Sequence, residues 1–179
     1  MTSSERNGQP RDAQPILTRR SSLLLPGMGA SALALRPTGL MGQTQHSVTA
    51  HNRAPGGAQM AFAPAVLRIM PGETVRFVHA DRGHNFQSHD NMLPPGAAPF
   101  IGEIGEELAI TFDQDGLYGY FCRPHQGMGM IGYVLVGKFT RTLDAVRAAS
   151  AALPGPMMAR RVEAYLAEIM AIGRAEALI

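Results

Sequence analysis

The chain has 179 residues, of which 45% are hydrophobic and 17% are charged, so it can bury one good-sized hydrophobic core and has little room for a second. Its formal net charge of +2 is unevenly distributed, because residues 1–43 hold five arginines and two acidic residues, whereas residues 44–179 hold eleven basic and twelve acidic residues. The main part of the chain is therefore close to neutral, which argues against a nucleic-acid-binding function.

Residues 1–43 have the organisation of an export signal. Arg19 and Arg20 precede an apolar run that contains glycine and proline, and Ala32 and Ala34 offer an A-x-A-like cleavage site. The paired arginines resemble a twin-arginine signal, which leads to the bacterial periplasm; the general export route, or a tail with a chance arginine pair, are the alternatives. No other segment approaches the length of an apolar membrane span, so we expect a mature form without membrane insertion.

Residues 44–139 are predicted to form a β-sandwich. Apolar side chains alternate with other residues over 73–80 and 107–112, and residues 133–136 form a short continuous apolar run. Turns that contain glycine or proline separate these segments, and no helical pattern lies between them. Such regular punctuation is typical of an antiparallel sandwich.

The hydrophobic pattern becomes helical in residues 140–179. Residues 142–150 form a short amphipathic segment, the sequence LPGP interrupts it, and Val162, Leu166 and Ile169 then recur at helical spacing. We expect two helices that pack their apolar sides on the sandwich. A helix that binds a partner protein is the alternative.

The stretch YFCRPHQGMGMIG, residues 120–132, admits two interpretations. Its glycines fit the G-x-G-x-x-G spacing of a dinucleotide-binding loop, but such a loop opens a helix and is followed about 20 positions later by an acidic residue. Here a strand-like segment follows, and position 152 is alanine. The context therefore argues against a dinucleotide site and leaves a site for a soft metal ion.

The same stretch contains Cys122, His125 and Met130, whose side chains suit copper. A copper ion that cycles between Cu(I) and Cu(II) is typically held by a thiolate, two imidazoles and a weak axial thioether. His84, just past a predicted strand and a turn, is the candidate for the second imidazole. Cys122 is the only cysteine, and ligation would shield this thiol in an oxidising compartment. A structural zinc site is disfavoured, because such sites use cysteine and histidine as ligands and not methionine.

The sequence resembles the pseudoazurins, a family of blue copper proteins. The resemblance rests on GHN at 83–85, on CRPHQGMGMIG, and on GAQMAFAPAVLRIMPGETVRFV, and it extends from about residue 44 to 172. It implies a mainly β, Greek-key cupredoxin sandwich of about eight strands with two C-terminal α-helices, and one copper ion that carries single electrons. The copper ligands that it implies are His84, Cys122, His125 and Met130.

The resemblance also implies roles for residues around these ligands. Asn85 is expected to connect the two ligand loops, and Met60 to pack beside an exposed His125; an ordinary core position is the alternative for Met60. Met128 has the ligand spacing of the amicyanins, whereas Met130 has that of pseudoazurins and plastocyanins. The C-terminal region favours the pseudoazurin spacing, so Met130 is the expected ligand.

We expect electron transfer rather than enzymatic turnover. Pro124 and Met128 would form an apolar rim near the copper, and Arg82 and Arg123 are the nearest cations, since Lys138 is the only lysine. The resemblance implies a monomer that donates electrons in the periplasm to a reductase of denitrification, such as copper nitrite reductase or nitrous oxide reductase. A periplasmic copper-binding or delivery protein is the alternative.

Overall fold

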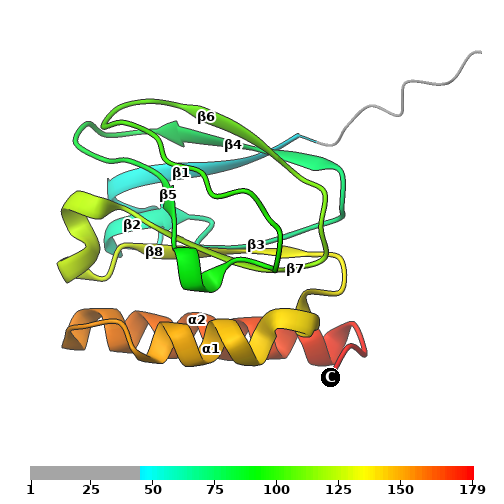
Figure 1. The fold of residues 1–179 in the computed structure, drawn as a ribbon. Coiled ribbons are helices and arrows are strands. Elements are labelled where there is room, and N and C mark those ends of the chain that lie inside the picture. Colours follow the sequence, from blue (N-terminus) through cyan, green and yellow to red (C-terminus); the bar gives the residue numbers. More distant parts are fainter. Residues whose placement is uncertain (1–44) are drawn as a thin grey trace, which may run out of the picture. The chain divides into compact units, whose positions relative to one another are not determined.

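The computed structural model describes residues 45–179, so the predicted export signal lies outside the described residues. Two four-stranded sheets pack face to face, and two α-helices lie against the second sheet (Figure 1). The first sheet has the order β2 (Gln59–Ala63), β1 (Gln45–Arg53), β4 (Glu73–His79) and β6 (Leu108–Phe112). The second has the order β3 (Val66–Ile69), β8 (Ile131–Val136), β7 (Gly116–Phe121) and β5 (Gln87–Ser88). The mainly β fold with eight strands is confirmed.

Two strand pairs are parallel, although the turn-rich sequence predicts an antiparallel sandwich. Strand β1 runs parallel to β4, and β3 runs parallel to β8. The reason is that β2 and β3 follow one another in the chain but belong to different sheets. The chain therefore leaves the first sheet and re-enters it as β4, in the same direction as β1. Hydrophobic alternation contains no information about this direction.

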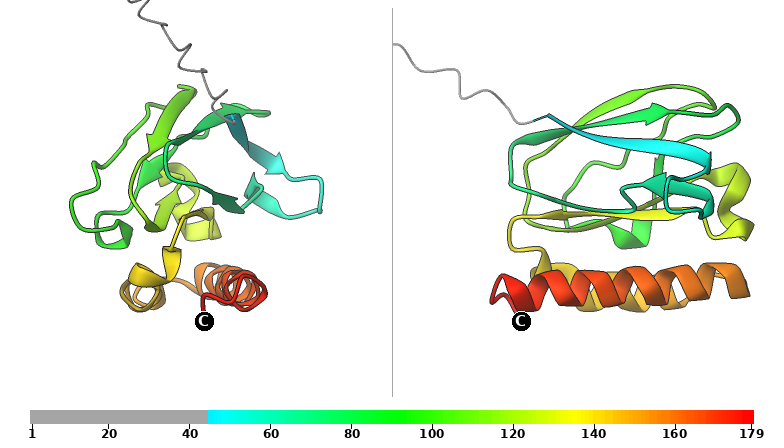
Figure 2. Two further views of the ribbon diagram at one scale, coloured as in Figure 1. Left: turned by 90° about the vertical axis from the view of Figure 1, so that its right-hand side faces the viewer. Right: turned by 180° about the vertical axis from the view of Figure 1, so that it is seen from behind.

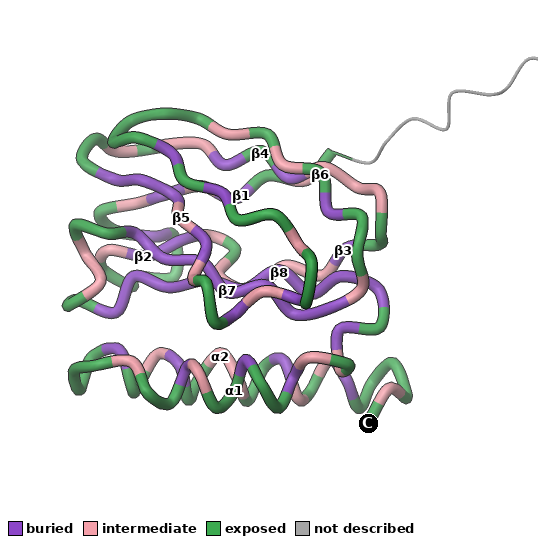
Figure 3. Tube along the Cα trace, in the orientation of Figure 1, coloured by how far each residue is buried: buried purple, intermediate pink, exposed green. Residues whose placement is uncertain are grey.

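Strands β7 and β8 are buried along their whole length, because the second sheet is covered on both faces (Figure 3). One face meets the first sheet through an aromatic cluster that includes Phe62, Phe77, Phe86, Phe100, Phe112 and Tyr120. The other face meets the helices through a second apolar cluster that includes Leu117, Tyr133, Leu135, Val146, Met158, Val162 and Ile169. Because both faces of the second sheet are covered, every side chain of residues 133–136 is buried, which explains the continuous apolar run there. In a strand with one exposed face, polar residues would alternate with the apolar ones.

The helices run side by side along the second sheet (Figure 2). They are α1 (Leu143–Ala151) and α2 (Pro156–Ala175), and three short 3₁₀-helices lie in the connections: η1 (Asp90–Met92), η2 (Arg123–Met128) and η3 (Phe139–Thr142). On α2 the buried side includes Met158, Val162 and Ile169, while Leu166 is half-buried. Among residues 45–179, no helix combines the length and hydrophobicity needed to cross a membrane.

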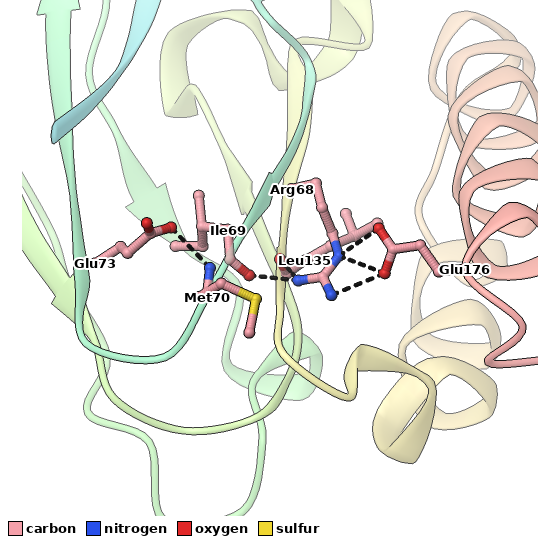
Figure 4. A network of polar contacts seen from close by, with 6 residues as sticks. All are labelled: Arg68, Ile69, Met70, Glu73, Leu135 and Glu176. Atoms are coloured by element: carbon pink, nitrogen blue, oxygen red, sulfur yellow. Dashed lines mark hydrogen bonds and ion pairs between the residues drawn. The ribbon is translucent and has the colours of Figure 1, made fainter. Parts of the chain in front are cut away.

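Arg68 on β3 connects the second sheet to the C-terminal end of α2 (Figure 4). Its guanidinium donates to both carboxylate oxygens of Glu176 at 2.8–3.0 Å and to the main-chain carbonyl groups of Ile69 and Leu135. It also lies over the ring of Phe139, 5.5 Å from the centroid. A two-point pair of this kind orients its partners better than a single contact does, although solvent exposure limits it to about 1 kcal/mol.

Candidate metal centre

The candidate ligands lie in two loops at one end of the sandwich. His84 follows β4 and a short turn, and the second loop joins β7 to β8 through η2 (Figure 1). Pro124 stands in the first turn of η2, where its missing N–H group is not needed. Gly129 ends η2 with a φ of 78°, a left-handed conformation that glycine adopts without strain. The loop thus reverses direction immediately before Met130.

His84, Cys122 and His125 bring three donor atoms together. The Cys122 Sγ lies 3.7 Å from the His84 Nδ1 and 3.4 Å from the His125 Nδ1, and the two Nδ1 atoms are 3.1 Å apart. A point equidistant from the three atoms lies about 2.0 Å from each, close to the ~2.0–2.3 Å bonds that imidazole and thiolate make to zinc, a first-row metal ion of similar kind. Among residues 45–179 this is the cluster of histidine, cysteine and acidic side chains suited to holding a metal ion.

Asn52 on β1 determines which nitrogen of His84 faces the cluster. The His84 ring is buried, and its Nε2 donates to the Asn52 Oδ1 at 3.1 Å. A neutral ring that carries its proton on Nε2 presents an unprotonated Nδ1 to the cluster. Burial lowers the pKa of His84, and the neighbouring His125 lowers it further, so the ring is kept neutral and able to bind a metal ion.

Cys122 is fully buried at the end of β7. Burial raises the pKa of its thiol, while hydrogen bonds from the backbone amide groups of Asn85 and His125 oppose that shift. Those amide groups favour the thiolate, which is the form that binds metal ions. A free cysteine that is buried and surrounded by donors is therefore prepared for ligation rather than for forming a disulfide.

The two methionines of the loop differ in exposure. Met130 is fully buried, whereas Met128 is 42% exposed. The main chain of Met130 is hydrogen-bonded to both loop ligands, because its N–H donates to the His125 carbonyl at 3.2 Å and its carbonyl accepts from the Cys122 N–H at 3.0 Å. Burial and these hydrogen bonds place Met130 next to the donor cluster and leave Met128 on the surface.

Asn85 links three segments around the site. Its Oδ1 accepts from the Arg123 N–H at 2.8 Å, and its Nδ2 donates to the Gly102 carbonyl at 3.1 Å. The Asn85 side chain is buried, so its hydrogen bond to Gly102 is protected from water, and the one from Arg123 is partly protected. The structure therefore places Asn85 between the loop of His84 and the loop of Cys122, the position that the resemblance implies.

The remaining predicted residues lie around the site. Pro124 and Met128 are exposed, as are Arg82 and Arg123. Met60 is half-buried against the core cluster that contains Cys122 and Met130. His125 is itself half-buried, so its ring reaches the edge of the protein surface.

Two residues beside the site were not singled out from the sequence. One is Asn52, and the other is Arg161 on α2, which donates to the main-chain carbonyl groups of Gln59, Met60 and Gly129. Neither belongs to a local sequence pattern. Asn52 is 32 residues from His84 in the sequence, and Arg161 is 32 residues from Gly129. Only the folded chain reveals their contacts.

The donor set and the fold agree with the relatives of this chain. A family model described as copper binding proteins of the plastocyanin/azurin family matches residues 48–137. The pseudoazurin of Paracoccus pantotrophus is 38% identical over 146 residues, which are 81% of this chain and 96% of that protein. The chain belongs to the pseudoazurin family.

Solved pseudoazurin structures share the fold. The pseudoazurin of Methylobacterium extorquens AM1 is 33% identical, with a TM-score of 0.65 over 70% of this chain and 99% of that one. The pseudoazurin of Hyphomicrobium denitrificans is also 33% identical, with a TM-score of 0.64 over 70% and 98% of the two chains. Like other pseudoazurins, this chain is a blue copper electron carrier and not an enzyme.

Proposed function

We propose that this pseudoazurin carries single electrons in the bacterial periplasm with a copper ion held by His84, Cys122, His125 and Met130. The observation that carries the assignment of His84, Cys122 and His125 is the triangle of donor atoms, whose sides of 3.1–3.7 Å suit a first-row metal ion without rearrangement. The burial of Met130 and its hydrogen bonds to the same loop support it as the fourth ligand. Copper bound there supplies the change between Cu(I) and Cu(II). The protein supplies a set of donors that stays in place.

The surrounding residues support a rigid site. Asn52 orients His84, Asn85 connects the two ligand loops, and the hydrogen bonds of Met130 close the second loop. A carrier must change its charge with little movement, because every displaced group adds to the barrier for electron transfer. Ligands that are buried or half-buried and are held by hydrogen bonds from several segments meet that requirement.

The electron would enter and leave through His125, the half-buried ligand. Pro124 and Met128 are exposed beside it and provide an apolar contact, and Arg82 and Arg123 add positive charge near the ligand loops. We propose that this protein is a monomer and that it forms a small, transient interface with a reductase of denitrification. The reductase would be either copper nitrite reductase or nitrous oxide reductase. The family resemblance supports this acceptor class.

Colour is the direct test of the proposed function. Copper-loaded protein should be intensely blue to green, from charge transfer between the Cys122 thiolate and Cu(II), and should bleach reversibly with a mild reductant. Cys122→Ser should fold, since serine is nearly the same size as cysteine and fits this buried core position, and should lose the colour. A wild-type copper complex without strong colour would contradict the proposal and favour a role in copper delivery.

A further inference from the structure

The guanidinium of Arg161 connects α2 to two segments beside the copper site. Its Nη1 donates to the carbonyl of Met60 and, at 3.2 Å, to that of Gly129, and its Nη2 donates to the carbonyl of Gln59. Arginine can satisfy several acceptors at once because its N–H donors form a rigid planar fork. One side chain therefore joins the second helix, the β2 strand and the end of the ligand loop.

The contact with Gly129 acts on the peptide group that leads into Met130. The oxygen of this peptide accepts from Arg161, and its N–H, which belongs to Met130, donates to the His125 carbonyl at 3.2 Å. Both polar ends of the peptide are thus held. Because a peptide group is planar, fixing both ends fixes its plane and the position of the Met130 Cα. The Met130 carbonyl accepts from the Cys122 N–H at 3.0 Å, so the next peptide is held as well, and the two together set the direction in which the Met130 side chain leaves the backbone.

The first turn of α2 also lies directly against this peptide. A Cβ atom on Gly129 would come within 2.9 Å of the Met157 carbonyl oxygen, so the loop and the helix backbone are in close contact there. The other hydrogen bonds of Met130, to His125 and Cys122, come from within the loop itself. Arg161 supplies the hydrogen bond that anchors the loop to a different layer of the fold.

We propose that Arg161 is a positioning residue for the copper centre, which acts by fixing the Gly129–Met130 peptide and so the approach of the Met130 thioether to the metal. The inference rests on the proposed ligand role of Met130. It assigns the C-terminal helices a part in the properties of the copper site, in addition to covering the second sheet.

The neighbouring Arg160 offers a matched control. It is exposed, it lies on the same turn of α2, and its replacement removes the same charge. We would compare Arg161→Gln and Arg161→Lys with Arg160→Gln. Lysine keeps the charge but presents a single ammonium group, which cannot span three carbonyl groups in the same way.

The first measurement is amide hydrogen exchange of the copper-free protein. Arg161→Gln should speed exchange of the Met130 and Cys122 amides about tenfold or more relative to Arg160→Gln, and should leave the amides of β4 unchanged, because only the loop loses an anchor. This measurement does not depend on copper. It can therefore succeed or fail independently of the proposed electron-transfer function.

The second measurement is the visible spectrum and reduction potential of the copper-loaded variants. Arg161→Gln should change both relative to Arg160→Gln, Arg161→Lys should give an intermediate result, and the change should largely disappear when Met130→Gln is already present. Equal exchange, spectrum and potential in the Arg161→Gln and Arg160→Gln variants would overturn the proposal. Faster exchange with an unchanged spectrum and potential would also overturn it.

If Arg161→Gln does not fold, Arg161→Lys is compared with Arg160→Gln in the same three measurements. A colourless wild-type complex would instead refute the proposed function.

Discussion

Individual side chains at this site act mainly through the atoms that they hold in place. Asn52 shows this clearly: its Oδ1 accepts a hydrogen bond from the Nε2 of His84, which keeps the ring proton on that nitrogen and leaves Nδ1 free for the metal ion. Asn85 acts in the same way on the peptide of Arg123. The ligands are therefore one part of the site, and the residues that orient them are another.

Asn52→Leu is predicted to weaken copper binding. The residue is exposed, so the variant should fold, but His84 would lose the acceptor that fixes its tautomer. Loss of such a partner typically lowers metal affinity by about ten- to a hundredfold. Competition with a copper chelator would measure it, with the exposed neighbour changed in Arg53→Leu as the control. Equal affinities in the two variants would show that Asn52 does not orient His84.

The two loop methionines should respond differently to substitution. Met130→Gln is expected to alter the visible spectrum and the reduction potential, because Met130 is the proposed axial ligand and an axial ligand tunes both. Met128→Ala, at an exposed position, should leave the spectrum nearly unchanged and slow only the reaction with a partner. Absorption spectra and electrochemistry of the two variants would distinguish them, and the reverse pattern would identify Met128 as the ligand.

At the residue scale, three side chains that the sequence singles out, those of His84, Cys122 and His125, come together in the structure, whereas some of the residues that support them could not be found from the sequence. Cys122 and His125 lie in one short loop, where spacing alone suggests a shared metal ion. His84 lies 38 residues before Cys122, and from the sequence its assignment as a ligand rests mainly on the family resemblance. Asn52 and Arg161 reach the site from β1 and α2, and no local pattern of polar residues indicates which tertiary contact such a side chain will make.

At the scale of elements, the strands and helices follow from hydrophobic pattern, whereas strand direction does not. The predicted segment 73–80 corresponds to β4, and 142–150 corresponds to α1 with a shift of one residue. The parallel pairing of β1 with β4 depends on the path of the chain between the two sheets, which no single strand's sequence encodes. Strands β7 and β8 are buried along their whole length because the helices cover the face of the sheet that would otherwise be exposed.

The packing of α1 on β8 predicts a loss of stability at high pH. Burial raises the pKa of Tyr133 to about 12, against a hydrogen bond with Ser150 that lowers it. Below pH 10 the phenol is protonated in both the folded and the unfolded chain, so it causes no pH dependence. Between pH 10 and 12 only the unfolded chain loses the proton, so the free energy of unfolding should fall by about 2–3 kcal/mol.

Tyr133→Phe should remove this contribution. Its free energy of unfolding should fall less steeply between pH 10 and 12 than that of the wild type, even if the lost hydrogen bond to Ser150 lowers its stability at pH 8 by about 1 kcal/mol. Denaturant titrations at several pH values would measure both slopes. Tyr120, whose pKa burial also raises, is present in both proteins and does not affect the comparison. Identical slopes in the two proteins would mean that Tyr133 has the same pKa in the folded and the unfolded chain.

On the scale of the whole molecule, the copper site and the main sheet-to-helix ion pair lie at different ends. Figure 1 shows η2 at one end of the layers and the C-terminal end of α2 at the other. Glu176, which pairs with Arg68, is the residue that directly follows α2. Arg161 and Arg68 thus hold the two halves of α2 to the sandwich at separate places. The end with the site exposes both apolar side chains and cations.

Recognition of the acceptor should be mostly apolar and only weakly dependent on salt. Arg82 and Arg123 are the cations proposed to lie nearest the ligands, and charges at the rim of a small interface, below about 1,200 Å², act chiefly on the association rate. Arg82→Glu or Arg123→Glu should slow electron transfer a few-fold without changing the copper spectrum. Stopped-flow kinetics over a range of ionic strength would measure this, with Arg174→Glu near the far end of α2 as control. A steep salt dependence that neither substitution alters would place the docking cations elsewhere.

The contrast between buried Met130 and the exposed methionines also bears on how this protein ages chemically. Thioethers react with peroxide to form sulfoxides, and access decides which one reacts first. Met70 is 57%, Met157 47% and Met128 42% exposed, whereas Met130 is fully covered. Hydrogen peroxide should therefore convert these exposed methionines, including Met128 beside the site, well before Met130. Early damage would make the rim polar and hinder contact with partners, while the colour of the copper centre persisted.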